Sequence, residues 1–151
     1  MNVKSDTKAK LAFCDYLVNE LGYDTARVIK SPADIVAEKD GVQWFFEIKK
    51  TSKRNYFGAA TETEWKQAYS DPEHYRFVVA LTEDNEESFE WFIFTPEQME
   101  KVSTIPPFKV FFSINLDAPI EDQEPKHKSS TIALNQETFE TLYVVFDKQR
   151  K

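Results

Sequence analysis

Hydrophobic and polar residues are arranged along this chain in segments that predict helices and strands of ordinary length. Apolar residues recur at helical spacing from Asp6 or Thr7 to about Leu21, and Gly22 is expected to end this helix. Three apolar runs follow at 25–29, 33–38 and 42–50, and a hairpin turn joins the last two at 39–41. The first third of the chain therefore predicts one helix followed by three strands.

The remaining pattern is less regular but still predicts an α/β fold. Residues 51–60 are polar and predict a loop, after which a helix begins at Thr61 or Thr63, with Glu64 serving its start. Further elements are strands at 75–82, 89–94 and 108–115, a helix starting at Thr95, a loop at 116–130 and a helix at 136–148. The order αβββαββαβα predicts a mixed β-sheet flanked by helices, within one domain spanning residues 1–151.

Composition narrows the class of protein. The chain has 151 residues, 41% of them hydrophobic and 15% aromatic, which is enough for one core. Cys14 is the single cysteine, so no intramolecular disulfide forms, and its apolar surroundings predict a small core residue. No apolar segment approaches the ~20 residues of a membrane span, and the first residues are too polar for a secretion signal. These features predict a cytoplasmic protein.

Charge is distributed unevenly along the chain. The net charge is −7, which disfavours extensive contact with nucleic-acid phosphates. Lys49, Lys50, Lys53 and Arg54 nevertheless fall within six residues and predict a local basic face. The acidic runs 83–87 and 121–124 are interpreted as solvated loops.

Two carboxylates and one ammonium group form the candidate site. Asp34 lies in an apolar strand, and the neighbouring strand carries Glu47 and Lys49, which share one face because side chains alternate. Pairing of these strands would bring Asp34 beside Glu47, and the backbone carbonyl of Ile48 would complete a set of oxygen ligands. Such a set suits Mg²⁺ or Mn²⁺. Alternatively, acid and lysine simply alternate where an exposed strand reaches solvent.

A resemblance to a known family rests on these residues. The chain resembles the PD-(D/E)XK nucleases with the restriction-endonuclease-like fold, in particular Mrr-type domains and the C-terminal domain of the plant NO VEIN protein. Glu47-Ile48-Lys49 matches the second half of the motif, whereas Pro32-Ala33-Asp34 departs from a contiguous Pro-Asp. The wider match over residues 8–82 comprises Glu47, Lys49, Thr51, Phe57, Glu64, Ala68 and Tyr75.

The resemblance implies a metal-dependent nuclease core that acts on DNA. Asp34 and Glu47 would be metal ligands and Lys49 the catalytic lysine. Many members also use an acid from the first helix, for which Asp15 and Glu20 are candidates. Gln67 is a candidate for the polar residue that related enzymes carry in the helix after the third strand.

Residues that follow the site are candidates for nucleic-acid contact. Lys50, Lys53 and Arg54 would bind phosphates, and Tyr56 would stack on a base. The alternative is an ordinary solvated loop. The chain has three glycines and no phosphate-binding loop, its two histidines and one cysteine do not form a zinc motif, and no serine or cysteine nucleophile motif occurs.

These observations predict a Mg²⁺-dependent endonuclease that hydrolyses DNA, with restriction, phage defence or repair as roles implied by the family. A homodimer is expected, because cutting both strands takes two sites. A protein partner that supplies specificity is a further expectation. The main alternative is a catalytically inactive module of the same fold that binds nucleic acid or a protein, and a protein that mimics DNA charge is the third.

Overall fold

The computed structural model describes residues 3–104, 109–125 and 134–140. The helices are α1 (Val3–Asn19), α2 (Glu62–Ser70) and α3 (Pro96–Lys101), with a 3-10 turn η1 at Ile120–Asp122. The strands are β1 (Thr25–Val28), β2 (Ile35–Lys39), β3 (Val42–Thr51), β4 (Asn55–Thr61), β5 (Tyr75–Leu81), β6 (Glu90–Phe94), β7 (Ser103–Thr104) and β8 (Lys109–Asn115).

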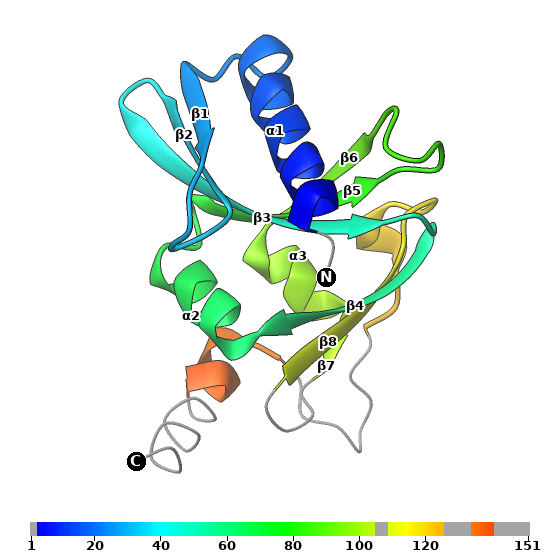
Figure 1. Cartoon of the computed structure of the whole chain (residues 1–151). Helices are drawn as coiled ribbons and strands as arrows, with labels where there is room; N and C mark the ends of the chain where they lie inside the picture. Colours follow the sequence, from blue (N-terminus) through cyan, green and yellow to red (C-terminus); the bar gives the residue numbers. More distant parts are fainter. Residues whose placement is uncertain (1–2, 105–108, 126–133, 141–151) are drawn as a thin grey trace.

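The described strands form two sheets (Figure 1). The larger sheet has the order β1-β2-β3-β5-β6, and the smaller has the order β4-β8-β7. Strands β3 and β5 run parallel, whereas every other neighbouring pair is antiparallel. The chain leaves the larger sheet after β3, forms β4 and α2, and returns as β5. The predicted mixed sheet is therefore confirmed, with a second sheet added to it.

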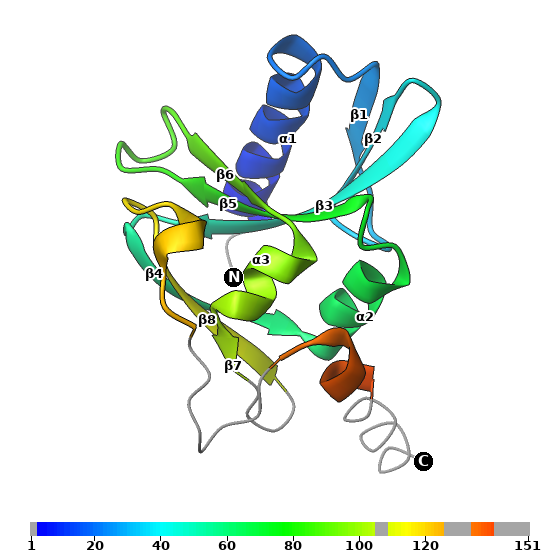
Figure 2. The same cartoon turned by 180° about the vertical axis from the view of Figure 1, so that it is seen from behind.

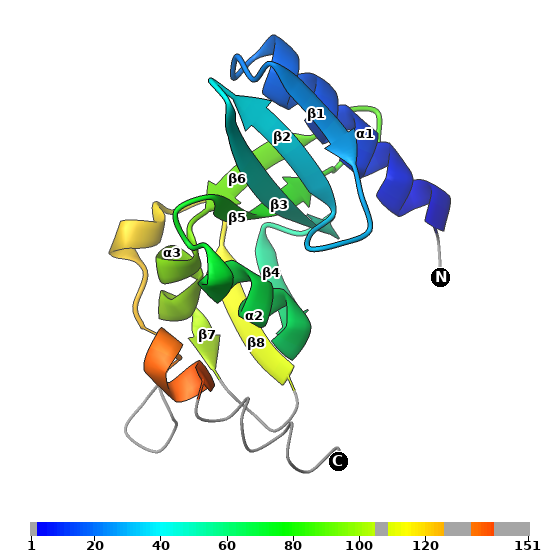
Figure 3. The same ribbon diagram turned by 90° about the vertical axis from the view of Figure 1, so that its left-hand side faces the viewer.

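Helices cover both faces of the larger sheet (Figure 3). On one face Phe13 and the predicted core residue Cys14 of α1 form a buried cluster with Phe46 of β3. On the opposite face Trp65 of α2 packs with Phe77 of β5, and the same cluster extends into the smaller sheet. Figure 2 shows α3 between the two sheets, where it contacts β5, β6 and β7. Tilted and edge-on contacts between buried aromatic side chains thus join the layers.

Glycine and threonine residues end or begin several helices and turns, as the sequence predicted. Gly22, with a φ of +77°, comes shortly after α1, although this helix begins at Val3 and not at Asp6 or Thr7 as predicted. The hairpin turn has φ values of +53° at Asp40 and +79° at Gly41. Thr61 caps α2 through a capping box, in which its hydroxyl accepts a hydrogen bond from the Glu64 N–H. Thr95 caps α3 in the same way.

The prediction of a loop at residues 51–60 was wrong. Strand β4 occupies most of this segment and pairs along its whole length with β8, about fifty residues further along the chain. Gly58 permits close packing here, because a Cβ at this position would lie 2.7 Å from Phe112 and 2.8 Å from Tyr56. A strand held by such a distant partner carries little local signal.

Other differences concern the last third of the chain. Strand β7 was not predicted, and it has only two residues. The predicted loop at 116–130 contains the turn η1, while residues 126–130 lie outside the described residues. The predicted final helix is described for residues 136–140, and the rest of it lies outside. The described part of the chain has no helix long and apolar enough to cross a membrane.

Candidate active site

Asp34 lies immediately before β2, one residue outside the strand in which it was predicted. Its N–H donates to the Phe46 carbonyl at 3.1 Å, and its carbonyl accepts from the Ile29 N–H at 2.8 Å. Pro32 has no N–H to join a strand ladder, which favours a later start of β2. The carboxylate is held by β3, because Asp34 Oδ2 accepts a hydrogen bond from the Ile48 N–H at 2.8 Å.

Glu47 and Lys49 share the face of β3 that is turned away from α1, as side-chain alternation predicted. The neighbouring residue Phe46 faces α1, where it belongs to the buried cluster. Glu47 is 8% exposed, and only 16% of the Lys49 side chain is exposed. Burial of two ionisable groups on one short stretch of strand is costly unless partners compensate it.

The predicted catalytic residues meet in one cavity of about 300 Å³. Its lining includes Lys10, Asp34, Glu47, Ile48, Lys49 and Tyr56. The cavity is therefore built by α1, the start of β2, the end of β3 and the start of β4. Because residues 51–60 were predicted to form a loop, the contribution of β4 to the cavity lining was not predicted.

Charges in the cavity are matched except at one carboxylate. Asp34 Oδ1 lies 3.3 Å from Lys10 Nζ, and Lys49 Nζ donates to Glu64 Oε1 at 2.8 Å. Glu47 Oε2 lies 3.9 Å from the same Lys49 Nζ, so it shares a cation that already has a nearer partner. Burial, with the negative charges of Glu64 and Asp34, raises the pKa of Glu47 well above its ordinary value.

Lys49 remains an ammonium group in this setting. Burial lowers the pKa of Lys49, but the neighbouring charges of Glu64 and Glu47 outweigh it and raise the pKa overall. Glu64 Oε1 also accepts the Thr61 N–H at 2.9 Å, so one oxygen joins the start of α2 to Lys49. The contact of Glu64 with Lys49 of β3 was not predicted from the sequence, which indicated a role at the helix start, because this contact depends on the tertiary fold.

Tyr75 adds a second uncompensated polar group beside the carboxylates. It is 1% exposed, and its hydroxyl has no hydrogen-bond partner among the described residues. Burial and the negative charges of Glu47, Glu64 and Asp34 all raise the pKa of Tyr75, so the hydroxyl stays protonated. A neutral donor beside these acids has the chemistry to bind a water molecule or a ligand oxygen.

The other predicted catalytic candidates are not among the residues that line the cavity. Asp15 is exposed on α1, Glu20 is exposed just after it, and Gln67 is half-buried on α2. The first helix instead contributes Lys10, a cation where an acid was expected.

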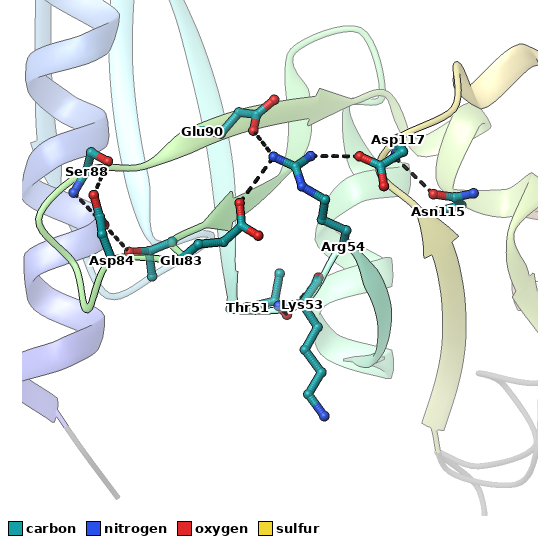
Figure 4. Close-up of polar contacts among 10 residues, drawn as sticks. Thr51, Lys53, Arg54, Glu83, Asp84, Ser88, Glu90, Asn115 and Asp117 are labelled. Atoms are coloured by element: carbon teal, nitrogen blue, oxygen red, sulfur yellow. Dashed lines mark hydrogen bonds and ion pairs between the residues drawn. The ribbon is translucent and has the colours of Figure 1, made fainter.

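Two of the four predicted nucleic-acid-binding residues, Lys50 and Arg54, have acidic partners that the sequence did not reveal. Lys50 Nζ donates to Glu86 Oε1 at 2.7 Å. Arg54 contacts Glu83 at 3.2 Å, Glu90 at 2.8 Å and Asp117 at 2.9 Å (Figure 4). The run 83–87 is a mostly exposed loop, as predicted, but Glu86 and Glu83 in it also pair with Lys50 and Arg54.

Metal ligands in this cavity would be oxygen atoms. Within the part of the chain that the structure describes, no group of three or more His, Cys, Asp or Glu side chains is placed to hold a metal ion. Asp34 and Glu47 supply two carboxylates, and the unpartnered Tyr75 hydroxyl lies near them. Mg²⁺ is commonly held by one or two carboxylates, with water and phosphate oxygens completing the shell, so the residues fit Mg²⁺ or Mn²⁺.

Comparisons with known proteins identify the fold. No family model matches the sequence, and no curated protein matches it. The structure is similar to that of Hjc, a Holliday junction resolvase from the archaeal hyperthermophile Archaeoglobus fulgidus, with a TM-score of 0.50 and 17% identity. The match covers 73% of this chain and 89% of Hjc. The chain has a restriction-endonuclease-like fold.

Proposed function

We propose that this chain is a divalent-metal-dependent nuclease that hydrolyses DNA phosphodiester bonds. The observation that carries the proposal is the buried Glu47 carboxylate, which lacks a cation of its own and shares a cavity with Asp34 and Lys49. A divalent cation would supply the missing positive charge. The resemblance to PD-(D/E)XK nucleases of the Mrr and NO VEIN branch supports the same assignment, as does the fold shared with Hjc.

Asp34 and Glu47 would hold Mg²⁺ or Mn²⁺ in this cavity. When bound, the cation would make a water molecule more acidic and offset charge on the phosphate. The backbone N–H of Ile48 orients Asp34 by its hydrogen bond to Oδ2. The Ile48 carbonyl stays a proposed third ligand.

Lys49 would stabilise the negative charge that develops on the phosphate during attack by water. A preorganised ammonium in a partly dry cavity is effective there, because little reorganisation is needed at the moment of reaction. Glu64 positions this ammonium through the 2.8 Å hydrogen bond and is itself fixed by the start of α2. Lys10, which pairs with Asp34 in the free protein, would turn to a substrate phosphate once a cation occupies the site.

A catalytically inactive binding module is the second candidate. The net charge of −7 and the pairing of Lys50 and Arg54 with carboxylates favour it, because little free positive charge remains for phosphates. A protein partner that supplies DNA affinity would reconcile both candidates.

Incubation of purified protein with supercoiled plasmid and Mg²⁺ or Mn²⁺ tests the proposal. We expect conversion to nicked or linear DNA that stops on addition of a chelator, since the carboxylates need the cation. Asp34→Asn should lose this activity, whereas Asp15→Asn, an exposed carboxylate outside the cavity, should keep it. Equal activity of Asp34→Asn and the wild type, or cleavage in the chelator, would contradict the assignment.

A further inference from the structure

We propose that the cleft next to the catalytic cavity binds a single-stranded DNA segment, with Phe57 stacking on an unpaired base. The inference rests on the proposed function, since it names the form of DNA that this site takes. The cleft has a volume of about 890 Å³. Lys50 and Tyr56 line both the cleft and the catalytic cavity, so a strand in the cleft continues to Asp34 and Glu47.

Phe57 is the aromatic group that the cleft presents to solvent. It lies on β4 and is 68% exposed, the highest value among the exposed large hydrophobic residues. Its neighbour Tyr56, which the sequence analysis predicts to stack on a base, also lines the cleft and packs edge-on against Phe112 with ring centroids 5.3 Å apart. The exposure of Phe57 at the cleft therefore assigns the stacking role to it. Every base has a π-face, so this contact tolerates any sequence.

Charge in the cleft favours a single strand over a duplex. Its lining contains two lysines, Lys50 and Lys53, and two glutamates, Glu83 and Glu86. Lys50 is paired with Glu86, and Arg54 nearby is held by three carboxylates. Duplex binding draws its affinity from many phosphate contacts, which this balanced lining does not offer.

Lys53 is the cation best placed for one phosphate. Its N–H donates to Thr51 Oγ1 at 3.0 Å, which fixes its backbone at the cleft. Figure 4 shows its side chain extending away from the carboxylates around Arg54. Hydroxyl and amide groups of Ser52, Asn55 and other lining residues add donors and acceptors for base edges. Stacking with one or two phosphate contacts is thus the binding mode that the cleft supports.

Fluorescence anisotropy in EDTA tests the inference, because DNA binds without being hydrolysed. We expect labelled oligodeoxythymidine of about 12 nucleotides to bind about tenfold or more tightly than a duplex of the same length. The slope of log K against log salt should be about −0.7 to −1.4, as for one or two phosphates. Phe57→Ala should weaken binding about tenfold, and Phe57→Trp should restore it.

Leu11→Ala is the matched control, since Leu11 is 55% exposed on α1 and does not line the cleft. It should bind the oligonucleotide like the wild type. Lys53→Gln should make the salt slope about 0.7 shallower. Equal or tighter duplex binding, an unchanged affinity of Phe57→Ala, or absence of oligonucleotide binding would overturn the inference. Binding in EDTA without metal-dependent cleavage of any DNA would contradict only the nuclease assignment.

Discussion

If the chain hydrolyses DNA as proposed, we expect replacement of Lys49 by methionine to lower kcat by at least about 100-fold and to leave the affinity for DNA almost unchanged. Methionine keeps most of the side-chain volume but removes the ammonium that lies 2.8 Å from Glu64 and 3.9 Å from Glu47. The affinity should survive because Lys49 is not among the residues that line the proposed strand-binding cleft. Single-turnover cleavage of labelled DNA, together with anisotropy in EDTA, separates the two quantities.

Loss of Lys49 also leaves the partly buried Glu64 carboxylate without its cation and removes the cation nearest to Glu47, which should destabilise the fold. The double variant Lys49→Met with Glu64→Gln removes one charge of each sign, so it should fold more stably and remain inactive. Glu64→Gln alone should retain more activity than Lys49→Met, because the ammonium is still present. Lys66→Met, an exposed lysine on α2, is the matched control. A folded double variant with wild-type kcat would refute the role of Lys49.

We expect replacement of Glu47 by glutamine to stabilise the metal-free protein at neutral pH by about 1–3 kcal/mol. The pKa of Glu47 is raised above its ordinary value of 4.5, so the folded state keeps a proton that the unfolded chain loses as pH rises. The stability that this proton contributes is complete below pH 4.5 and is lost as pH rises toward the raised pKa. Glutamine cannot ionise and avoids that loss.

Urea unfolding from pH 4.5 upward measures the free energy of unfolding of Glu47→Gln and of the wild type. The two values should be equal at pH 4.5, and the gap between them should widen by up to about 1.4 kcal/mol per pH unit. Glu38→Gln, an exposed carboxylate on β2, should follow the wild type throughout. Addition of Mn²⁺ should make the wild type more stable than Glu47→Gln, because only the wild type gains binding energy from the metal. A constant gap between Glu47→Gln and the wild type at all pH values would contradict the buried-carboxylate account.

Local signals made much of the fold predictable. The turn at 39–41, the threonine caps at Thr61 and Thr95, and the alternation on β3 each depend on neighbouring residues. The same alternation placed Glu47 and Lys49 on one face, turned away from the α1 cluster, and the hairpin brought Asp34 beside them. Local sequence signals were therefore sufficient to predict that Asp34, Glu47 and Lys49 lie together in the candidate site.

Contacts between residues far apart in the chain could not be predicted from the sequence. Strand β4 depends on β8, and its glycine and alanines resemble a loop when they are considered without that partner. Glu64 reaches Lys49, and the acids at 83–90 reach Lys50 and Arg54, only after the chain has folded. Lys10 in place of an acid on α1 is visible in the sequence, but its proximity to Asp34 is not.

Calorimetric titration of Mn²⁺ into the wild type, Asp34→Asn and Glu47→Gln tests the central claim most directly. We expect saturable binding to the wild type, with or without DNA, and a loss of about tenfold or more in affinity for each variant, since each removes one of two carboxylate ligands. Glu38→Gln should bind like the wild type. Absence of binding to the wild type in the presence of DNA, or equal affinity of all four proteins, would contradict a metal-dependent site at Asp34 and Glu47.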